Sequence, residues 1–292
     1  MKKIISLILA VAMLCCMAFT LVSCGGNDTK IGVQAGTTGE LYLKGDADMM
    51  FSGYSNIDCK AYNTAGLAVQ AMINGQIDYV VIDNEPAKML AGLNPEIKMI
   101  DVPLSTEEYA FGVDKDQADL LAALNELIAD MKADGSLDAI YEKYNSLEYD
   151  EDGNVIGGDE AIVGISGGSK NNSNAEGQLV VATNAAFAPF EYKKGDLFCG
   201  IDIEIMAALA TKLNLELVIE DMDFDAVVTA VGKNNIDIAA SGLTIKESRK
   251  QAVNFSSAYY DGAYQVLLVL KTNTEFDACT TKAQIEEILK AK

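Results

Sequence analysis

Beyond its first 24 residues, the chain alternates short apolar runs with segments whose apolar residues recur at helical spacing. Residues 78–82 and 179–183 are apolar runs long enough for buried strands, and the first of them ends at Asp83. One face of the segment 120–131 carries Leu120, Leu121, Leu124, Leu127, Ile128 and Met131, which predicts an amphipathic helix. Strands that alternate with helices indicate an α/β sheet rather than a β-sandwich.

The same patterns place further elements along the chain. Strands are predicted over residues 31–34, 97–102, 215–219 and 236–240, and helices over 65–74, 203–213, 227–231 and 281–292. Two extended runs, 108–113 and 264–270, are interpreted as strands that cross between two lobes. Residues 146–177 are rich in Gly, Asp, Asn and Ser, which is typical of a flexible linker. That linker is either a tether between former termini or a spacer between independent domains.

The first 24 residues form a targeting segment and are excluded from the fold. Lys2 and Lys3 precede an apolar run over residues 4–22, which is typical of a signal peptide. The quartet Leu21-Val22-Ser23-Cys24 resembles a bacterial lipobox, and this resemblance implies cleavage before Cys24 and acylation of that residue. An uncleaved membrane anchor is the alternative. Both interpretations place the remaining chain outside the cytoplasmic membrane.

Composition excludes several classes of function. A net charge of −21 leaves no basic stripe for nucleic acid. The chain contains no histidine, which removes the Ser-His-Asp and Cys-His catalytic arrangements, and neither a metal site nor a cofactor is expected. Cys59, Cys199 and Cys279 are odd in number and scattered, so no disulfide framework is implied.

Two motifs carry a resemblance to a known family. Residues 30–39 read Lys-Ile-Gly-Val-Gln-Ala-Gly-Thr-Thr-Gly, and residues 177–192 include Asn184-Ala185-Ala186-Phe187-Ala188-Pro189-Phe190-Glu191. Both resemble signatures of the amino-acid-binding proteins of ABC importers, the type II periplasmic binding proteins of family 3. In that family the second motif opens the mature protein and the first begins its other lobe. The reversed order here predicts a circularly permuted protein with a two-lobe α/β fold, in which lobe 2 precedes lobe 1.

This resemblance assigns the lobes. Lobe 2 is expected over residues 30–108, completed by a C-terminal helix over 276–292. Residues 109–145 supply a hinge strand and helices that return to lobe 1, the linker occupies 146–177, and lobe 1 follows over 178–270. The C-terminal helix should pack beside the strand that starts at Ile31. A monomer is expected, and a domain-swapped dimer is the structural alternative.

A strand end, a turn, a helix start and an arginine follow one another over residues 240–249, which favours an anion site. An arginine can bind a carboxylate through two parallel hydrogen bonds. By resemblance, lobe 1 holds the carboxylate or amino group of the ligand through Ser241, Gly242, Thr244 and Arg249. The alternative is a surface ion pair of Arg249 with Glu247.

Lobe 2 should supply the opposite side of the same site. Thr38 lies in a glycine-rich turn, and Asp83 is placed to pair with the ligand's ammonium group, although it could simply cap the following helix. By resemblance, Phe187 and Phe224 enclose the side chain of the ligand, and specificity lies with Asn184, Glu191 and Gln34.

The function implied by the resemblance is a lipid-anchored receptor on the extracellular or periplasmic side of the membrane. It would capture a free amino acid, polar or basic in preference, by lobe closure and deliver it to the permease of an ABC importer. One alternative is an enzyme on the same fold that resembles cyclohexadienyl dehydratases, with Glu191 as its general acid. Another is a ligand-sensing module without transport.

Overall fold

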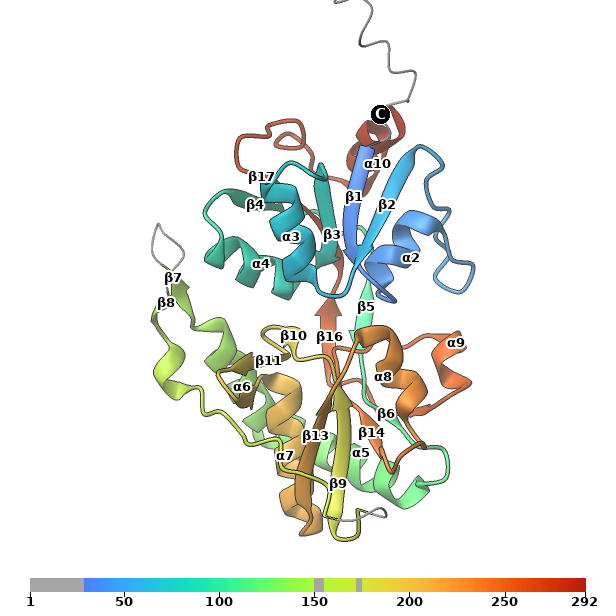
Figure 1. Cartoon of the computed structure of the whole chain (residues 1–292), viewed down its shortest axis with the longest axis vertical. Helices are drawn as coiled ribbons and strands as arrows, with labels where there is room; N and C mark the ends of the chain where they lie inside the picture. The colour runs from blue at the N-terminus through green and yellow to red at the C-terminus, as the bar shows by residue number, and fades with distance from the viewer. Residues whose placement is uncertain (1–28, 150–154, 172–174) are drawn as a thin grey trace, which may run out of the picture.

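The computed structural model describes residues 29–149, 155–171 and 175–292, which form two α/β lobes joined by two crossing strands (Figure 1). The α/β class and the two-lobe arrangement expected from the sequence are confirmed. The targeting segment with Cys24 lies outside the described residues. Within the described part of the chain, no helix is both long enough and apolar enough to cross a membrane.

Lobe 2 is built on a five-stranded sheet. Its strands, in spatial order, are β2 (Ile57–Tyr62), β1 (Thr29–Gln34), β3 (Tyr79–Asp83), β17 (Gln265–Leu270) and β4 (Ile97–Ile100). The helices are α2 (Thr38–Lys44), α3 (Ala65–Ile73), α4 (Asn84–Leu93) and α10 (Lys282–Lys290). All five residues of β3 are buried, which explains its uninterrupted apolar sequence, since a sheet covered on both faces has no polar side.

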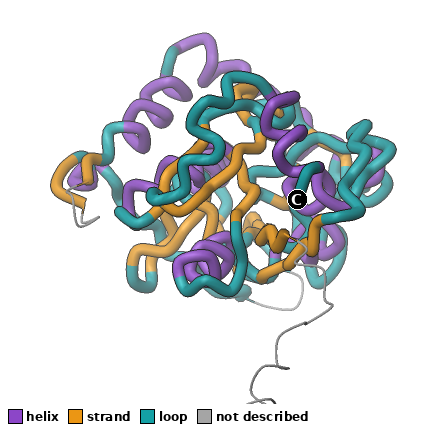
Figure 2. The backbone as a smooth tube through the Cα atoms, turned by 90° about the horizontal axis from the view of Figure 1, so that it is seen from above, coloured by secondary structure: helices purple, strands orange, loops and turns teal. Residues whose placement is uncertain are grey.

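Lobe 1 repeats this plan on a second five-stranded sheet. Its strands are β13 (Glu216–Asp221), β9 (Gln178–Thr183), β14 (Ile238–Ala239), β6 (Gly112–Val113) and β15 (Asn254–Phe255), and beside them lie β10 (Ala186–Phe187), β11 (Glu191–Lys194) and β12 (Leu197–Cys199). The helices are α5 (Ala118–Asp134), α6 (Ser136–Asn145), α7 (Ile201–Leu213), α8 (Phe224–Ala230) and α9 (Glu247–Lys250). Seen from above, strands run through the middle of the molecule with helices and loops on either side (Figure 2).

The lobes are joined by an antiparallel pair of strands, β5 (Glu107–Tyr109) and β16 (Tyr260–Ala263), which lies between them in Figure 1. The first crossing was expected at this position, but the second was misplaced. Residues 265–270 form β17, which pairs with β3 and β4 inside the sheet of lobe 2. Lobe 1 therefore ends before β16, and the predicted boundary at residue 270 is wrong. The apolar run was misread because a buried sheet strand and a crossing strand share the same pattern.

The segment 146–177 is more ordered in its described residues than its composition suggests. β7 (Glu148–Tyr149) and β8 (Val155–Gly157) form a hairpin, and a 3₁₀ turn, η1 (Asp159–Ala161), follows. Ile165 exchanges two backbone hydrogen bonds with Phe198 of lobe 1, at 2.8 and 2.9 Å. These contacts place the second half of the segment against lobe 1, while the flexibility of the linker stays a prediction.

The two ends of the described chain meet in lobe 2. α10 begins with a capping box in which the Thr281 hydroxyl accepts from the backbone of Gln284. Its residues Ile285 and Leu289 are fully buried in one apolar cluster with Ile31 of β1. The helix expected to complete lobe 2 therefore lies against the first strand of that lobe.

Candidate functional site

The candidate site lies where the parallel strands of both sheets end. Gln34 and Asp83 are the last residues of β1 and β3, while Asn184 and Ser241 follow β9 and β14. Ligands of open α/β sheets bind beyond the carboxyl ends of the strands, because loops and helix starts gather there. The two lobes turn these ends toward each other, so polar side chains from distant parts of the sequence converge between them.

A narrow pocket lies between the lobes, and the space of about 250 Å³ not filled by atoms there includes open solvent at its mouth. Its lining comprises Gln34, Thr37, Thr38, Asp83, Phe187, Phe224, Gly242, Thr244 and Arg249. Eight of the eleven ligand-binding residues expected from the sequence are thus brought together. Thr37 was not expected, although it belongs to the same glycine-rich turn as Thr38. The other three expected residues, Asn184, Glu191 and Ser241, are buried but do not line the pocket.

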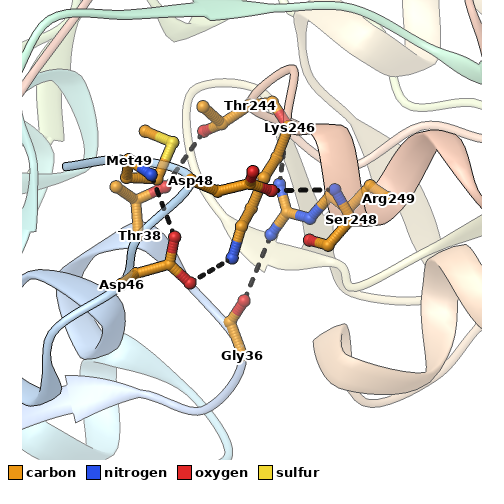
Figure 3. Close-up of polar contacts among 9 residues, drawn as sticks. All are labelled: Gly36, Thr38, Asp46, Asp48, Met49, Thr244, Lys246, Ser248 and Arg249. Carbon is orange, nitrogen blue, oxygen red and sulfur yellow. Dashed lines mark hydrogen bonds and ion pairs between the residues drawn. The ribbon is translucent and has the colours of Figure 1, made fainter. Parts of the chain in front are cut away.

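Arg249 is the single arginine of the chain and reaches across the space between the lobes. Its two terminal nitrogens donate to the carbonyl of Thr244 in lobe 1, at 2.9 Å, and to that of Gly36 in lobe 2, at 3.1 Å (Figure 3). The guanidinium carbon lies 5.4 Å from the centre of the Phe224 ring. Burial lowers the pKa of Arg249, with Glu107 and Asp83 opposing that effect.

The expected alternative for Arg249 is not seen. Glu247 pairs instead with Lys250, at 2.5 Å, and none of the ion pairs in the described part of the chain involves Arg249. The guanidinium group therefore donates to two carbonyl oxygens and forms no direct ion pair with a carboxylate of the described residues.

Asp83 is the opposite charge of the site. Its side chain is buried and accepts a hydrogen bond from the Tyr109 hydroxyl at 2.5 Å. It makes no capping hydrogen bond to α4, so the alternative role as a helix cap is absent. Burial, together with the nearby charge of Glu107, raises the pKa of Asp83 to about 7. A cation that binds beside such a buried carboxyl group would stabilise its charged form.

Aromatic rings form the apolar walls. The Phe187 ring stacks on Phe190, with centroids 6.0 Å apart. A Cβ atom at Gly242 would lie 2.9 Å from Phe187, and the backbone there has φ of +51°. Glycine is therefore required at this turn for two independent reasons, a left-handed conformation and the close approach of the ring.

Two contacts close the pocket from the sides. The side-chain nitrogen of Gln34 donates to the amide oxygen of Asn184 at 2.8 Å, across the two lobes. The hydroxyl of Thr38 donates to that of Thr244 at 3.2 Å. The structure is consequently a closed form, in which Asn184 contacts the opposite lobe rather than the pocket.

Glu191 lies behind the pocket as half of a buried acid pair. Its Oε1 accepts from the Ser241 hydroxyl at 2.7 Å, while the carboxylate of Asp202 accepts from Tyr259 and from the backbone of Gly242. Both carboxyl groups are fully buried. Burial raises the pKa of Asp202 to about 7 and that of Glu191 well above its usual range, and in Glu191 the charge of Asp202 adds to the effect. Among the described residues, Glu191 Oε2 has no hydrogen-bond partner, which fits a carboxyl group that keeps its proton.

This pair should make stability depend on pH. A carboxyl group whose pKa is raised by folding loses its proton first in the unfolded chain, so the free energy of unfolding falls as pH rises from about 4 to about 7 and beyond. Glu191→Gln should make that slope shallower in thermal or urea unfolding of the ligand-free chain. The exposed Glu126→Gln serves as the control, and equal slopes in all three proteins would contradict the assignment.

Part of the chain matches a protein-family model and several known proteins. Residues 179–291 match the model of bacterial extracellular solute-binding proteins, family 3. The arginine-binding extracellular protein ArtP of Bacillus subtilis is 38% identical over 102 residues, which cover 34% of this chain and 40% of that protein. A probable histidine-binding protein of Neisseria gonorrhoeae is 39% identical over 93 residues, which cover 31% of this chain and 34% of that protein.

Each alignment with these curated relatives covers 40% or less of the relative's own length. Among solved structures, the arginine-bound form of domain 1 from TmArgBP is 31% identical, covers 40% of this chain and 95% of that chain, and has a TM-score of 0.29. The part of the chain that matches the family model includes Phe187, Phe224 and Arg249 of the pocket.

Proposed function

We propose that this chain, whose residues 179–291 belong to family 3 of the bacterial extracellular solute-binding proteins, binds a free amino acid between its two lobes. The main support for this proposal is that Arg249 and Asp83 line the same pocket. They stand on different lobes, have opposite charges, and make no ion pair among the described residues. An amino acid carries the two complementary charges on adjacent groups.

In this proposal the carboxylate of the ligand lies against Arg249, Thr244 and Thr38, and its ammonium group against Asp83. A zwitterion is costly to remove from water unless both charges find partners. Those partners come together only when the lobes meet, so the ligand stabilises the closed form through its higher affinity for that form. Phe187 and Phe224 would enclose the side chain.

We propose a basic or polar amino acid as the ligand. Asp83 and the buried Glu107 place two carboxyl groups against the single guanidinium of Arg249, which leaves the region short of positive charge. A basic side chain would compensate that deficit. The names of the relatives, which bind arginine or are described as probable histidine-binding proteins, support the same class. Gln34 and Asn184 offer amide groups to a polar side chain, and Glu191 and Ser241 would act through the pocket wall.

Three further parts of the proposal concern the cellular setting. Cys24 would carry a lipid anchor, the chain would face the extracellular or periplasmic side, and the ligand would pass to an ABC permease. The placement of both lobes in one chain supports a monomer that is circularly permuted relative to its family. Permease and ATPase genes beside this gene would favour import, whereas a kinase gene would favour sensing.

The enzymatic alternative has less support. It requires a general acid in the cleft, and Glu191 was the candidate. Glu191 does not line the pocket, and its fully buried carboxyl group accepts a hydrogen bond from Ser241. A group in that position does not touch a ligand in the pocket, so it is not placed to transfer a proton to one.

A thermal-shift screen with the twenty amino acids tests the proposed function. A ligand that binds only the folded chain with a micromolar Kd should, at 1 mM, stabilise it by about 4 kcal/mol. For a chain of this size that corresponds to a rise in Tm of about 8–16 °C. The expected result is such a rise with one or a few basic or polar amino acids. A screen in which none of the twenty changes the Tm would overturn the proposal.

A further inference from the structure

A second set of contacts joins the lobes outside the pocket. The loop that follows α2, residues 45–56 of lobe 2, reaches the segment of lobe 1 that leads into α9 (Figure 3). The ammonium group of Lys246 lies 2.5 Å from a carboxylate oxygen of Asp46. A carboxylate oxygen of Asp48 accepts from the backbone N–H of Ser248 at 2.9 Å. None of these four residues lines the pocket.

The loop presents Asp46 in a fixed position. Its second carboxylate oxygen accepts from the backbone of Met49 at 3.0 Å, and its backbone exchanges two hydrogen bonds with Phe51, at 2.9 and 2.8 Å. The side chains of Asp46 and Lys246 are 17% and 11% exposed, the lowest combination among the ion pairs of the described residues. An ion pair that is mostly shielded from water and held by other bonds loses less to screening and side-chain entropy than a surface pair.

We propose that these contacts form an interlobe latch, comprising Asp46, Asp48, Lys246 and the Ser248 backbone, that determines ligand affinity without touching the ligand. The inference rests on the proposed function, since it concerns the closing of the same two lobes. Each contact spans the lobes, so opening the cleft breaks both. The latch therefore adds to the stability of the closed form by the same amount whichever amino acid is bound.

Because the latch lies outside the pocket, its loss should affect the apparent Kd differently from the loss of a pocket residue. The apparent Kd equals the Kd of the closed form divided by the fraction of the protein that is closed. Loss of the latch lowers that fraction, so it weakens every ligand by one common factor and leaves the ranking of ligands unchanged. A residue that contacts the ligand would change the ranking. Because the closed complex opens sooner without the latch, most of the loss should lie in the dissociation rate.

The test uses Asp46→Asn in the full chain, with Asp277→Asn as the matched control. Asp277 pairs with Lys98 at the same distance, 2.5 Å, but both residues belong to lobe 2. Calorimetric titration with each amino acid that raises the Tm should show Kd increased about three- to tenfold, equally for all, in Asp46→Asn. The Kd of the control variant, Asp277→Asn, should stay within twofold of the Kd of the unchanged chain. A Kd within twofold for Asp46→Asn, or a loss confined to some ligands, overturns the latch.

A double-mutant cycle identifies the partner. Lys246→Met keeps the aliphatic stem and should weaken binding by the same factor as Asp46→Asn, and the double variant should lose no more than either alone. Additive losses would show that the two residues act separately and would overturn the pairing.

A measurement without ligand separates failure of the latch from failure of the proposed function. If no amino acid binds, the proposed function is wrong, but the latch still predicts a more open molecule when it is broken. Small-angle X-ray scattering at 20 mM NaCl should then give a larger radius of gyration for Asp46→Asn than for Asp277→Asn. Equal radii in that case would overturn the latch as well.

Discussion

Replacing Arg249 with alanine should weaken amino-acid binding by at least ~3 kcal/mol, because the carboxylate of the ligand would be buried without its cation. Calorimetric titration measures this directly, as a Kd at least about 150-fold higher. The effect should be large because Arg249 is the single arginine of the chain and forms no ion pair with the described residues.

Two controls keep this result interpretable. Lys250→Ala removes the neighbouring cation, which is exposed and pairs with Glu247, and should leave the Kd within about twofold. Arg249→Lys keeps the positive charge but loses the planar fork, so its Kd should fall between those of the unchanged chain and Arg249→Ala. Near-normal affinity for Arg249→Ala, in a variant whose ligand-free Tm is unchanged, would remove Arg249 from the site.

Replacing Asp83 with asparagine should be of similar severity, again ~3 kcal/mol or more, because the ammonium group of the ligand would be buried without a carboxylate. The matched control is Asp58→Asn, since Asp58 lies in the same sheet but pairs with exposed Lys60. Titrations at pH 7.5 measure both variants. Equal Kd values for the two would contradict the role of Asp83.

The raised pKa of Asp83 also predicts that ligand affinity depends on pH, and that Asp83→Asn removes this dependence. With a pKa of about 7 in the ligand-free site, the Asp83 carboxyl is neutral at lower pH and must lose its proton before it can pair with an ammonium group. Affinity should therefore rise with pH and level off above about 7, with Kd changing up to ~tenfold per unit of pH below that point. Asp83→Asn should abolish this dependence. A Kd that is constant from pH 5 to 8 in the unchanged chain would contradict the assignment.

Much of the fold and of the pocket lining could be predicted, because short sequence patterns mark the strand ends and the family motifs. Apolar runs that end in a polar residue located the strand ends, and strand ends of an α/β sheet face the ligand. Asp83 and the segment before Arg249 were found in this way. The glycine-rich turn with Thr38 and the loop with Phe187 were found from the family resemblance.

The remaining features depend on three-dimensional contacts that leave no local signal. The strand over residues 265–270 reads as a crossing strand until its pairing with β3 and β4 is known. Glu191 follows a pocket loop in sequence, yet its strand turns the carboxyl group inward to Ser241 and the neighbourhood of Asp202. Asp46 and Lys246 are 200 positions apart, and nothing in either segment indicates the other.

The proposed function requires that one chain builds one complete cleft around one amino acid. The most direct measurement is a crystal structure of the chain with the amino acid that raises its Tm most. We expect a ligand whose carboxylate contacts Arg249 and whose ammonium group contacts Asp83, both from the same chain. A ligand bound elsewhere, or one held by Arg249 of one chain and Asp83 of a second copy, would contradict it.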